Sequence, residues 1–289
     1  MKNGGYVLNK IALITDSTSD LPKEIQEMYN IEVLPLHVIY KDAEYEDGVD
    51  ITPEEVYNSL PREIPTTSLP SAGRVVELFQ RLKEEGYRDV LSIHISSGLS
   101  GTYAMIKNLE ETAKNIGLRL HVIDSKSISM GLGFLVIKAA QLIESNTPLN
   151  EIISTLDRFK SEIKVFFVLK SLEYLRKGGR IGLVEGTLGD MLSIKPIISV
   201  NSEGIYYTVV KSRGRKGSIR KLVDIVKNAI GKSRVRVAVM HGNALDEAMG
   251  ILQSIKDGVD TSGIFAGQVG PVVGVHTGPG LVGVGFCPE

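Results

Sequence analysis

The chain is poor in the residues that support several common kinds of site. Its 289 residues include one cysteine, Cys287, and no tryptophan. A lone cysteine excludes an internal disulfide and argues strongly against a cysteine-based metal site. The five histidines lack the H-x-x-H and H-E-x-x-H spacings that place two metal ligands on one helix face. The sequence therefore predicts neither a bound metal nor a cofactor.

Neither sign of charge is in excess, and long hydrophobic runs are missing. The 33 basic and 34 acidic residues leave a net charge of −1, whereas nucleic-acid-binding proteins usually have a basic excess. The longest apolar runs, such as VFFVL at 165–169, are far shorter than the ~20 residues of a membrane span. No charged segment followed by a long apolar one marks a signal peptide. We expect a cytoplasmic protein that binds no nucleic acid and has no integral membrane association.

The order of apolar and polar segments predicts an α/β fold. Apolar residues make up 43% of the chain, enough for a substantial interior, and the length suggests about two domains. Up to about residue 160, strand-like runs such as 31–40 alternate with polar loops and with helical patterns such as 71–85 and 102–116, which predicts a mainly parallel sheet flanked by helices. The segment 71–85 has its apolar residues at i, i+3, i+4 and i+7, which predicts a buried helix face formed by Val75, Leu78, Phe79 and Leu82. Beyond about residue 160 this regular alternation ends, and the glycine-rich segment 269–286 is predicted to form a pair of strands. We predict an N-terminal α/β domain at 1–165 and a second α/β (α+β) domain at 166–289.

Four loops are rich in hydroxyl side chains. They lie at 16–20, 66–71, 96–102 and 124–127, and most follow predicted strands. Ligands bind at the carboxyl edge of an open α/β sheet, so we expect these loops to meet there. Any one of them reads most simply as a serine helix cap. Four together favour a shared polar site that binds an anion through hydroxyl and backbone N–H groups.

The loop within HISSGLSGTY, residues 94–103, has three possible functions. A nucleophile elbow requires G-x-S-x-G, but in Gly98-Leu99-Ser100-Gly101 the second glycine comes one place early. A nucleotide-binding P-loop requires G-x-x-x-x-G-K-[ST], which the sequence lacks. Anion binding is left as the preferred interpretation, and any nucleotide would belong to a partner.

Six stretches of the sequence resemble the DegV family, whose members are also called fatty-acid-binding subunits of bacterial fatty acid kinase. In order, they are TDSTSDLP, TSLPS, SSGLSGTY, VIDSKSISMGLG, SLEYLRKGGRIG and GVHTGPGLVGVGF, between about Lys10 and Phe286. The resemblance implies a two-domain fold that buries a long-chain fatty acid, such as palmitate, stearate or oleate, in a tunnel between or beside the domains. It also implies an ATP-dependent kinase partner that converts the presented carboxylate to acyl phosphate.

The resemblance also assigns residues to the site. The expected contacts to the fatty-acid carboxylate are Thr67, Ser96, Ser97, Ser100, Gly101 and His276. A supporting role, or a role in the step with the kinase, is expected for Asp16, Arg180 and Arg213. Simpler interpretations stay open: Arg180 as a charge at a helix end, and His276 as an ordinary strand residue. The choice between Ser96 and Ser97 also stays open, and His94 is expected to be a strand residue that does not contact the carboxylate.

The function expected from these residues is binding rather than catalysis. Neutral hydroxyl and N–H donors hold a carboxylate while leaving it available as a nucleophile. One alternative is an acyl hydrolase that uses Ser97 or Ser100 with His276 as base. Another is a carrier of a different amphipathic carboxylate, such as a retinoid-like or sterol-like acid. Candidate walls for an acyl tunnel, or else ordinary core residues, are Ile128, Met130, Phe134, Phe166 and Phe167.

Overall fold

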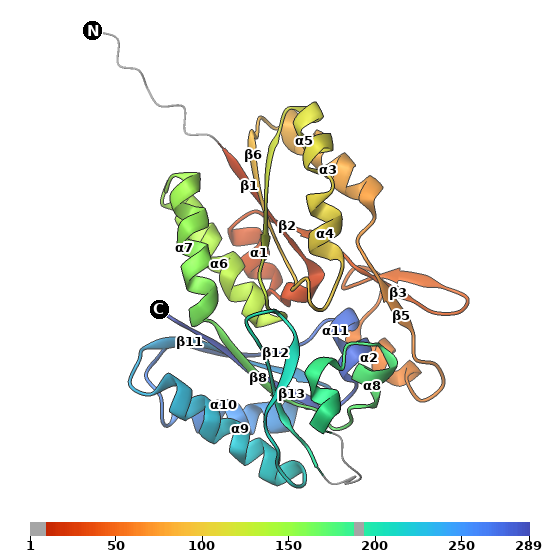
Figure 1. The fold of residues 1–289 in the computed structure, drawn as a ribbon, viewed down its shortest axis with the longest axis vertical. Coiled ribbons are helices and arrows are strands. Elements are labelled where there is room, and N and C mark those ends of the chain that lie inside the picture. The colour runs from red at the N-terminus through yellow and green to blue at the C-terminus, as the bar shows by residue number, and fades with distance from the viewer. Residues whose placement is uncertain (1–9, 188–193) are drawn as a thin grey trace.

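The computed structural model describes residues 10–187 and 194–289. Figure 1 shows a four-stranded sheet above a six-stranded sheet, with helix α6 (Met130–Glu144) packed against both. A small three-stranded sheet lies to one side. The arrangement confirms the predicted α/β class with a parallel sheet in the first part of the chain.

The four-stranded sheet is parallel throughout and has the order β2-β1-β6-β7. Its strands are β1 (Ile11–Asp16), β2 (Ile31–Leu34), β6 (Asp89–His94) and β7 (Arg119–Asp124). In β1, Ala12 and Ile14 belong to one core cluster and Leu13 to another, because successive side chains of a strand point to opposite faces. Both faces are covered, and β6 is buried along its whole length, as is usual in parallel sheets.

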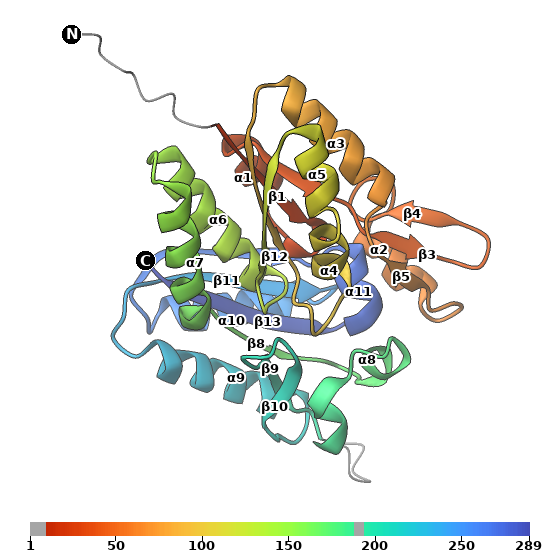
Figure 2. The same cartoon turned by 45° about the horizontal axis from the view of Figure 1, so that its top comes forward.

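Helices cover both faces of this sheet (Figure 2). One face carries α3 (Ala72–Glu84), α4 (Thr102–Lys107) and α5 (Glu110–Ile116). The other carries α1 (Lys23–Met28) and α6, with α7 (Leu149–Glu162) packed on α6. The residues predicted to form the apolar face of α3 are all buried: Val75, Leu78, Phe79 and Leu82. The single helix expected after Gly101 is instead two short helices separated at residues 108–109.

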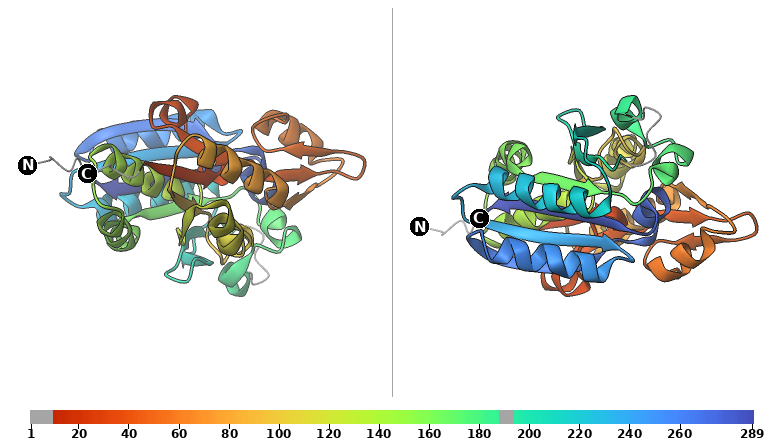
Figure 3. Two further views of the ribbon diagram at one scale, coloured as in Figure 1. Left: turned by 90° about the horizontal axis from the view of Figure 1, so that it is seen from above. Right: turned by 90° about the horizontal axis from the view of Figure 1, so that it is seen from below.

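The six-stranded sheet has the order β10-β9-β8-β13-β11-β12, and only its β11–β12 pair is parallel. Its strands are β8 (Lys164–Val168), β9 (Ile197–Val200), β10 (Tyr206–Val210), β11 (Val235–Gly242), β12 (Thr261–Gln268) and β13 (Leu281–Pro288). Figure 3 shows α9 (Arg215–Ile230) and α10 (Leu245–Lys256) on the face opposite α6. The predicted division after residue 165 falls inside β8, the first strand of this sheet.

The small sheet and its surroundings correct three sequence-based predictions. The sheet has the antiparallel order β4-β3-β5, formed by β3 (His37–Ile39), β4 (Glu44–Glu46) and β5 (Thr66–Ser68). Residues 66–68 therefore form a strand rather than a loop, and the strand predicted over 31–40 is broken near Pro35 into β2 and β3. The first half of the predicted C-terminal strand pair is a helix, α11 (Pro271–Thr277), because Pro271 follows an extended Gly270 and suits the first helical turn.

Two short helices and two 3-10 turns complete the fold. α2 (Pro53–Ser59) and α8 (Glu173–Lys177) both pack against α11. The 3-10 turns are η1 (Ser17–Ser19), directly after β1, and η2 (Gly182–Thr187), beside β10. Within the described ranges, no helix is long and apolar enough to cross a membrane.

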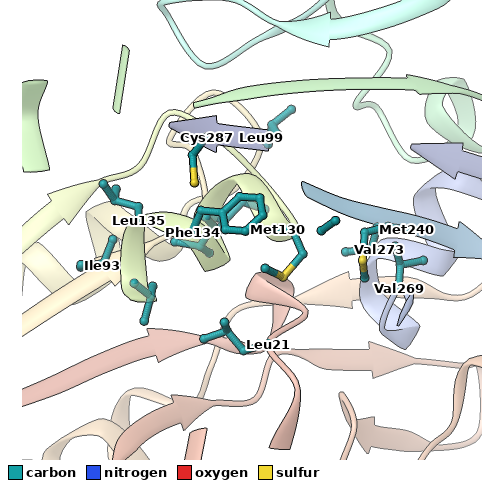
Figure 4. Close-up of a cluster of buried hydrophobic side chains, with 14 of the residues drawn as sticks. Leu21, Ile93, Leu99, Met130, Phe134, Leu135, Met240, Val269, Val273 and Cys287 are labelled. Atoms are coloured by element: carbon teal, nitrogen blue, oxygen red, sulfur yellow. The ribbon is translucent and has the colours of Figure 1, made fainter. Parts of the chain in front are cut away.

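The largest core cluster surrounds α6. Leu132, Leu135, Val136 and Ala139 of this helix are fully buried. Figure 4 shows Phe134 and Leu135 between Ile93 of the parallel sheet and Cys287 of the six-stranded sheet. One helix therefore supplies core side chains to both sheets, and the two parts of the chain share a continuous interior.

Candidate functional site

The loops at the carboxyl ends of β1, β6 and β7 are held together by Asp16. Its Oδ1 accepts hydrogen bonds from Thr18 N at 3.1 Å and Thr18 Oγ1 at 2.5 Å. Its Oδ2 accepts from Ile95 N at 2.9 Å and lies 2.9 Å from His94 Nδ1. The fully buried Asp16 carboxylate thus fixes η1 against the loop after β6. It supports the loop from beneath and does not line either cavity described below.

The contact between Asp16 and His94 extends to a serine in an order familiar from hydrolases. His94 Nε2 lies 2.6 Å from Ser92 Oγ, since residues two apart on β6 face the same side. Ser92, His94 and Asp16 have no solvent-exposed surface, so no substrate can reach the hydroxyl. These three side chains form a hydrogen-bonded polar network within the sheet. His94 is a strand residue, as predicted.

Two adjoining cavities lie between this edge and α11. We call the first the polar cavity, with a volume of about 30 Å³. Its polar lining comes from Thr18, Thr67, Ser100, Arg180, Tyr206, His276 and Thr277. The second, the apolar cavity of about 40 Å³, is lined mainly by apolar side chains and glycines, including Met130, Phe167, Met240, Val269 and Gly283. The two cavities are neighbours, because four residues line both: Ile128, Tyr206, Val273 and Thr277. The sequence did not predict that Tyr206 lines a cavity, because the strand that carries it contains no recognisable motif.

A pair of side chains from distant parts of the sequence forms one wall of the polar cavity. Thr67 Oγ1 lies 2.8 Å from His276 Nε2, because α11 packs against β5. Burial, together with the charge of Arg180, lowers the pKa of His276 to about 4, so the imidazole is neutral at neutral pH. Gly178 packs directly against His276 Nδ1, and a larger side chain there would displace the ring. His276 lies in a helix, which corrects its interpretation as a strand residue.

Arg180 contacts both the end of α8 and the loop after β6. Its Nη1 donates to Gly178 O at 2.7 Å, at the C-terminus of α8, as expected for a charge at a helix end. Its Nε donates to Leu99 O at 3.2 Å, and the side chain lines the polar cavity. The guanidinium therefore brings positive charge to the cavity and fixes the loop after β6.

Ser96 and Ser97 are turned away from both cavities. Ser96 Oγ is buried and donates to Gly204 O at 2.8 Å, across the contact with the β9–β10 turn. Ser97 Oγ accepts from Lys126 Nζ at 2.9 Å, and Ser97 N donates to Asp124 Oδ1 at 3.2 Å. These two serines therefore fix the loop instead of lining the polar cavity, and the structure brings neither hydroxyl to His276.

Ser100 is the serine of this loop that lines the polar cavity. Its hydroxyl lies 2.9 Å from Thr102 Oγ1 and accepts from Thr102 N at 3.2 Å, at the start of α4. Gly101 is the cap residue before α4 and packs against Leu69 of the neighbouring loop. Ser100 and His276 share the cavity, but Nε2 of the imidazole is paired with Thr67, so this geometry does not favour a serine–histidine nucleophile.

The remaining predicted residue, Arg213, lies outside the cavities. It is exposed, immediately before α9, and its backbone forms an isolated bridge with Ile194. In the part of the chain that the structure describes, no cluster of three or more histidine, cysteine, aspartate or glutamate side chains is suited to hold a metal ion.

Comparison with known proteins places this geometry in a family. The model of an uncharacterised protein family, DegV family COG1307, matches residues 10–289. A DegV domain-containing protein of Clostridium acetobutylicum is 45% identical over 278 residues, with 96% of this chain and 98% of that protein covered.

Two solved structures share the whole fold. A DegV family protein from Thermus thermophilus, described as binding fatty acid, matches with a TM-score of 0.90 and 31% identity over 97% of this chain and all of that one. A stearic acid-binding protein from Eubacterium ventriosum matches with a TM-score of 0.87 and 28% identity, over 97% and 98%. The family model and the clostridial relative each span nearly the whole chain. This chain belongs to the DegV family.

Proposed function

We propose that the protein binds one long-chain fatty acid, with its carboxylate in the polar cavity and its acyl chain in the apolar cavity. The observation that carries the proposal is that the two cavities are neighbours, with four lining residues in common: Ile128, Tyr206, Val273 and Thr277. An amphipathic carboxylate needs hydrogen-bond donors at one end and an apolar enclosure along the rest. The fatty-acid-binding DegV structures with the same fold support this assignment.

The Thr67–His276 pair suits a carboxylate held without a direct cationic clamp. A neutral imidazole protonated at Nε2 donates to Thr67 Oγ1, which leaves the Thr67 hydroxyl proton for the carboxylate. Ser100 lines the same cavity, and Arg180 supplies positive charge while bonded to backbone carbonyls. A carboxylate held mainly by neutral donors keeps its nucleophilicity. In this proposal the protein is a carrier, and a partner carries out the chemistry.

The apolar cavity has walls that can adapt to an acyl chain. Each buried methylene contributes about 0.8 kcal/mol, so a chain of C16 or C18 length needs few polar contacts for tight binding. The cavity of about 40 Å³ has to widen to admit such a chain. Met130 and Met240 line it, and methionine side chains change shape readily. Figure 4 shows Met240 beside Val269 and Val273, which also line this space.

Mass spectrometry of the purified protein tests the proposal. We expect denaturing solvent to release about one equivalent of palmitate, stearate or oleate per chain, because burial of the acyl chain makes dissociation slow. The intact mass under native conditions should exceed the denatured mass by that of the fatty acid. Protein that releases none and also fails to take up added palmitate or oleate would refute fatty-acid binding. Competition by retinoid-like or sterol-like acids separates carriers of other carboxylates.

We further propose that an ATP-dependent fatty acid kinase is the partner, which implies a cytoplasmic location. The sequence lacks a P-loop, so the phosphoryl donor has to come with another protein. The exposed Arg213 is suited to contact such a partner, because an arginine at a phosphoryl-transfer site stabilises the charge that develops there. The product, an acyl phosphate, can be trapped with hydroxylamine.

Replacing Arg213 with alanine tests the partnership. We expect ATP-dependent acyl phosphate formation with a bacterial fatty acid kinase to fall about tenfold or more. The fatty-acid content should not change, because Arg213 lies outside both cavities. Arg220→Ala, at an exposed position on α9, is the matched control. Equal activity of the Arg213 and Arg220 variants would contradict the role of Arg213.

A further inference from the structure

Two carboxyl groups meet the first turn of α11, at the opposite end of the helix from His276. Asp20 Oδ1 accepts from Gly270 N at 2.8 Å, and Asp47 Oδ1 accepts from Val272 N at 3.2 Å. A β-carbon on Gly270 would lie 3.3 Å from each of these two oxygens, so both carboxyl groups lie beside one backbone position. Both residues precede the six-stranded sheet in the chain, and α11 follows β12. The pair therefore ties α11 to the first part of the protein.

The surroundings of the pair disfavour two negative charges at once. Burial, with smaller contributions from Asp47 and Asp16, raises the pKa of Asp20 to about 7. Burial and the charge of Asp16 raise the pKa of Asp47 to about 6. The buried Asp47 Oδ2 has no hydrogen-bond partner among the described residues, although the Ser17 hydroxyl lies close to this carboxyl. Near neutral pH the pair retains a proton that two solvent-exposed carboxyls would have lost.

The other titratable groups around the pair come from four elements. Asp16 ends β1, and Lys23 begins α1 and lines the same surface groove as the two carboxyls. Tyr57 of α2 and Tyr206 of β10 both feel the charge of Asp20. Burial raises the pKa of both tyrosines, so they stay neutral at neutral pH. Lys23 is exposed and its charge is screened by solvent, so it offsets little of the repulsion between the carboxyls.

The Asp20–Asp47 pair is connected to the apolar cavity by a hydrogen bond and to the polar cavity by helix α11. Asp20 Oδ2 accepts from Ser129 Oγ at 2.5 Å, and Ser129 precedes α6 and lines the apolar cavity. At the other end of α11, His276 Nε2 meets Thr67 in the polar cavity. A helix of this length spans only about 10 Å at 1.5 Å per residue, so α11 moves as one body. A shift at Gly270 is therefore transmitted to His276.

We propose that Asp20 and Asp47 are positioning residues for the fatty-acid site, which hold α11 and His276 in place only while the pair retains a proton. The inference rests on the proposed function, because it concerns the retention of the same ligand. Loss of the proton leaves two neighbouring charges beside one backbone position, with Asp47 buried and Asp20 half-buried, and their repulsion pushes the first turn of α11 away. The carboxylate site then loosens, and the fatty acid leaves more readily.

The sign of the pH dependence follows from the direction of both pKa shifts. An acid whose pKa is raised in the folded protein stabilises it below that pKa, and the contribution is lost as the pH rises through it. The values of about 6 and about 7 place the change between about pH 6 and about pH 8. We expect retention of the fatty acid to fall over this range. The His276 imidazole, whose pKa is about 4, titrates well below this pH range.

The test measures transfer of radiolabelled palmitate from the full-length protein to phosphatidylcholine vesicles across this pH range. Wild-type protein is expected to release palmitate about tenfold faster at the upper end, the change that a shift of one pKa unit between the tight and loosened states produces. Asp20→Asn imitates the protonated acid, because asparagine can still accept from Gly270 N, and its release rate should stay at the low-pH wild-type value. The effect of pH on palmitate itself cancels in the ratio of wild-type to variant rates.

Control variants separate the pair from general charge effects. Asp157→Asn, on the exposed face of α7, should keep the wild-type profile. Asp47→Asn leaves only one of the two carboxyls able to ionise, so it should flatten the profile as Asp20→Asn does, and it replaces the Asp20 variant if that one does not fold. A flat wild-type profile, or an Asp20→Asn profile with the wild-type slope, would overturn the proposal.

A second measurement needs no fatty acid. The ring signals of His276 in NMR spectra should shift between about pH 6 and about pH 8 in wild-type protein and stay constant in Asp20→Asn, although the imidazole itself titrates near pH 4. Protein that binds no palmitate at any pH but shows this shift would refute the proposed function and leave the control of α11 by the pair standing. Constant wild-type signals would overturn that control.

Discussion

Replacing Thr67 with alanine is expected to weaken fatty-acid binding by about ten- to a hundredfold. The substitution removes the hydroxyl that meets His276 Nε2 and is proposed to donate to the carboxylate. A hydrogen bond to a charged group contributes about 1.5–3 kcal/mol, and a factor of ten in affinity corresponds to about 1.4 kcal/mol. Since Nδ1 of His276 already lacks a partner among the described residues, the variant also leaves a buried imidazole without its contact to Thr67. Displacement of a labelled fatty acid by palmitate measures the change.

Two matched variants make this expectation specific. Thr67→Ser keeps a hydroxyl on β5 and should retain affinity within about threefold, because only a methyl group is lost. Thr66→Ala makes the same chemical change at the neighbouring exposed position and should not alter binding. If Thr67→Ala binds palmitate as tightly as wild-type protein does, the carboxylate is not held by the Thr67–His276 pair.

Replacing Leu135 with alanine is expected to lower the free energy of unfolding by about 2–5 kcal/mol, the usual cost of a leucine-to-alanine change in a core. Leu135 is fully buried in the cluster around α6, which also contains Ile93 of the parallel sheet and Cys287 of the six-stranded sheet. Because α6 supplies core side chains to both sheets, the loss should affect them together. Urea unfolding followed by circular dichroism should give a lower midpoint in a single transition.

The matched control for this expectation is Leu245→Ala, at an exposed position at the start of α10. Surface substitutions usually change stability by no more than about 0.5 kcal/mol. An early transition of one sheet in Leu135→Ala, with the other sheet unchanged, would contradict a shared core. A stability loss as small as that of Leu245→Ala would show that the cluster around α6 contributes little.

The first part of the fold was predictable because its signals are local. The alternation of apolar strands and amphipathic helices indicated the parallel sheet, and the spacing of Val75, Leu78 and Leu82 marked the buried face of α3 correctly. Residues 271–277 were predicted to form a strand but form helix α11, and the reason is physical. Apolar residues occupy almost every position of α11, since the helix packs against α2, α8 and the small sheet, so the segment shows no helical period.

The sequence predicted where the candidate site lies in the fold better than it predicted which side chains line it. Three of the four hydroxyl-rich loops do meet at the carboxyl edge of the parallel sheet, whereas Thr67 reaches the site from β5 of another sheet. Which serine of the loop after β6 lines the cavity depends on the contact of Ser96 with Gly204, 108 residues away in the sequence. Contacts between residues so far apart in the sequence leave no local sequence pattern. The same holds for the hydrogen bonds of Asp20 and Asp47 to the first turn of α11.

The position of β13 has a consequence for how the protein is made. This strand lies between β8 and β11, in the interior of the six-stranded sheet, although it follows every other strand of that sheet in the chain. During translation, the β8–β9–β10 group and the β11–β12 pair are therefore complete before the strand that joins them has left the ribosome. Their open edges expose unpaired backbone groups in this interval, which favours pairing with other chains. Released chains that end before residue 281 should consequently depend on chaperones far more than released chains that include β13.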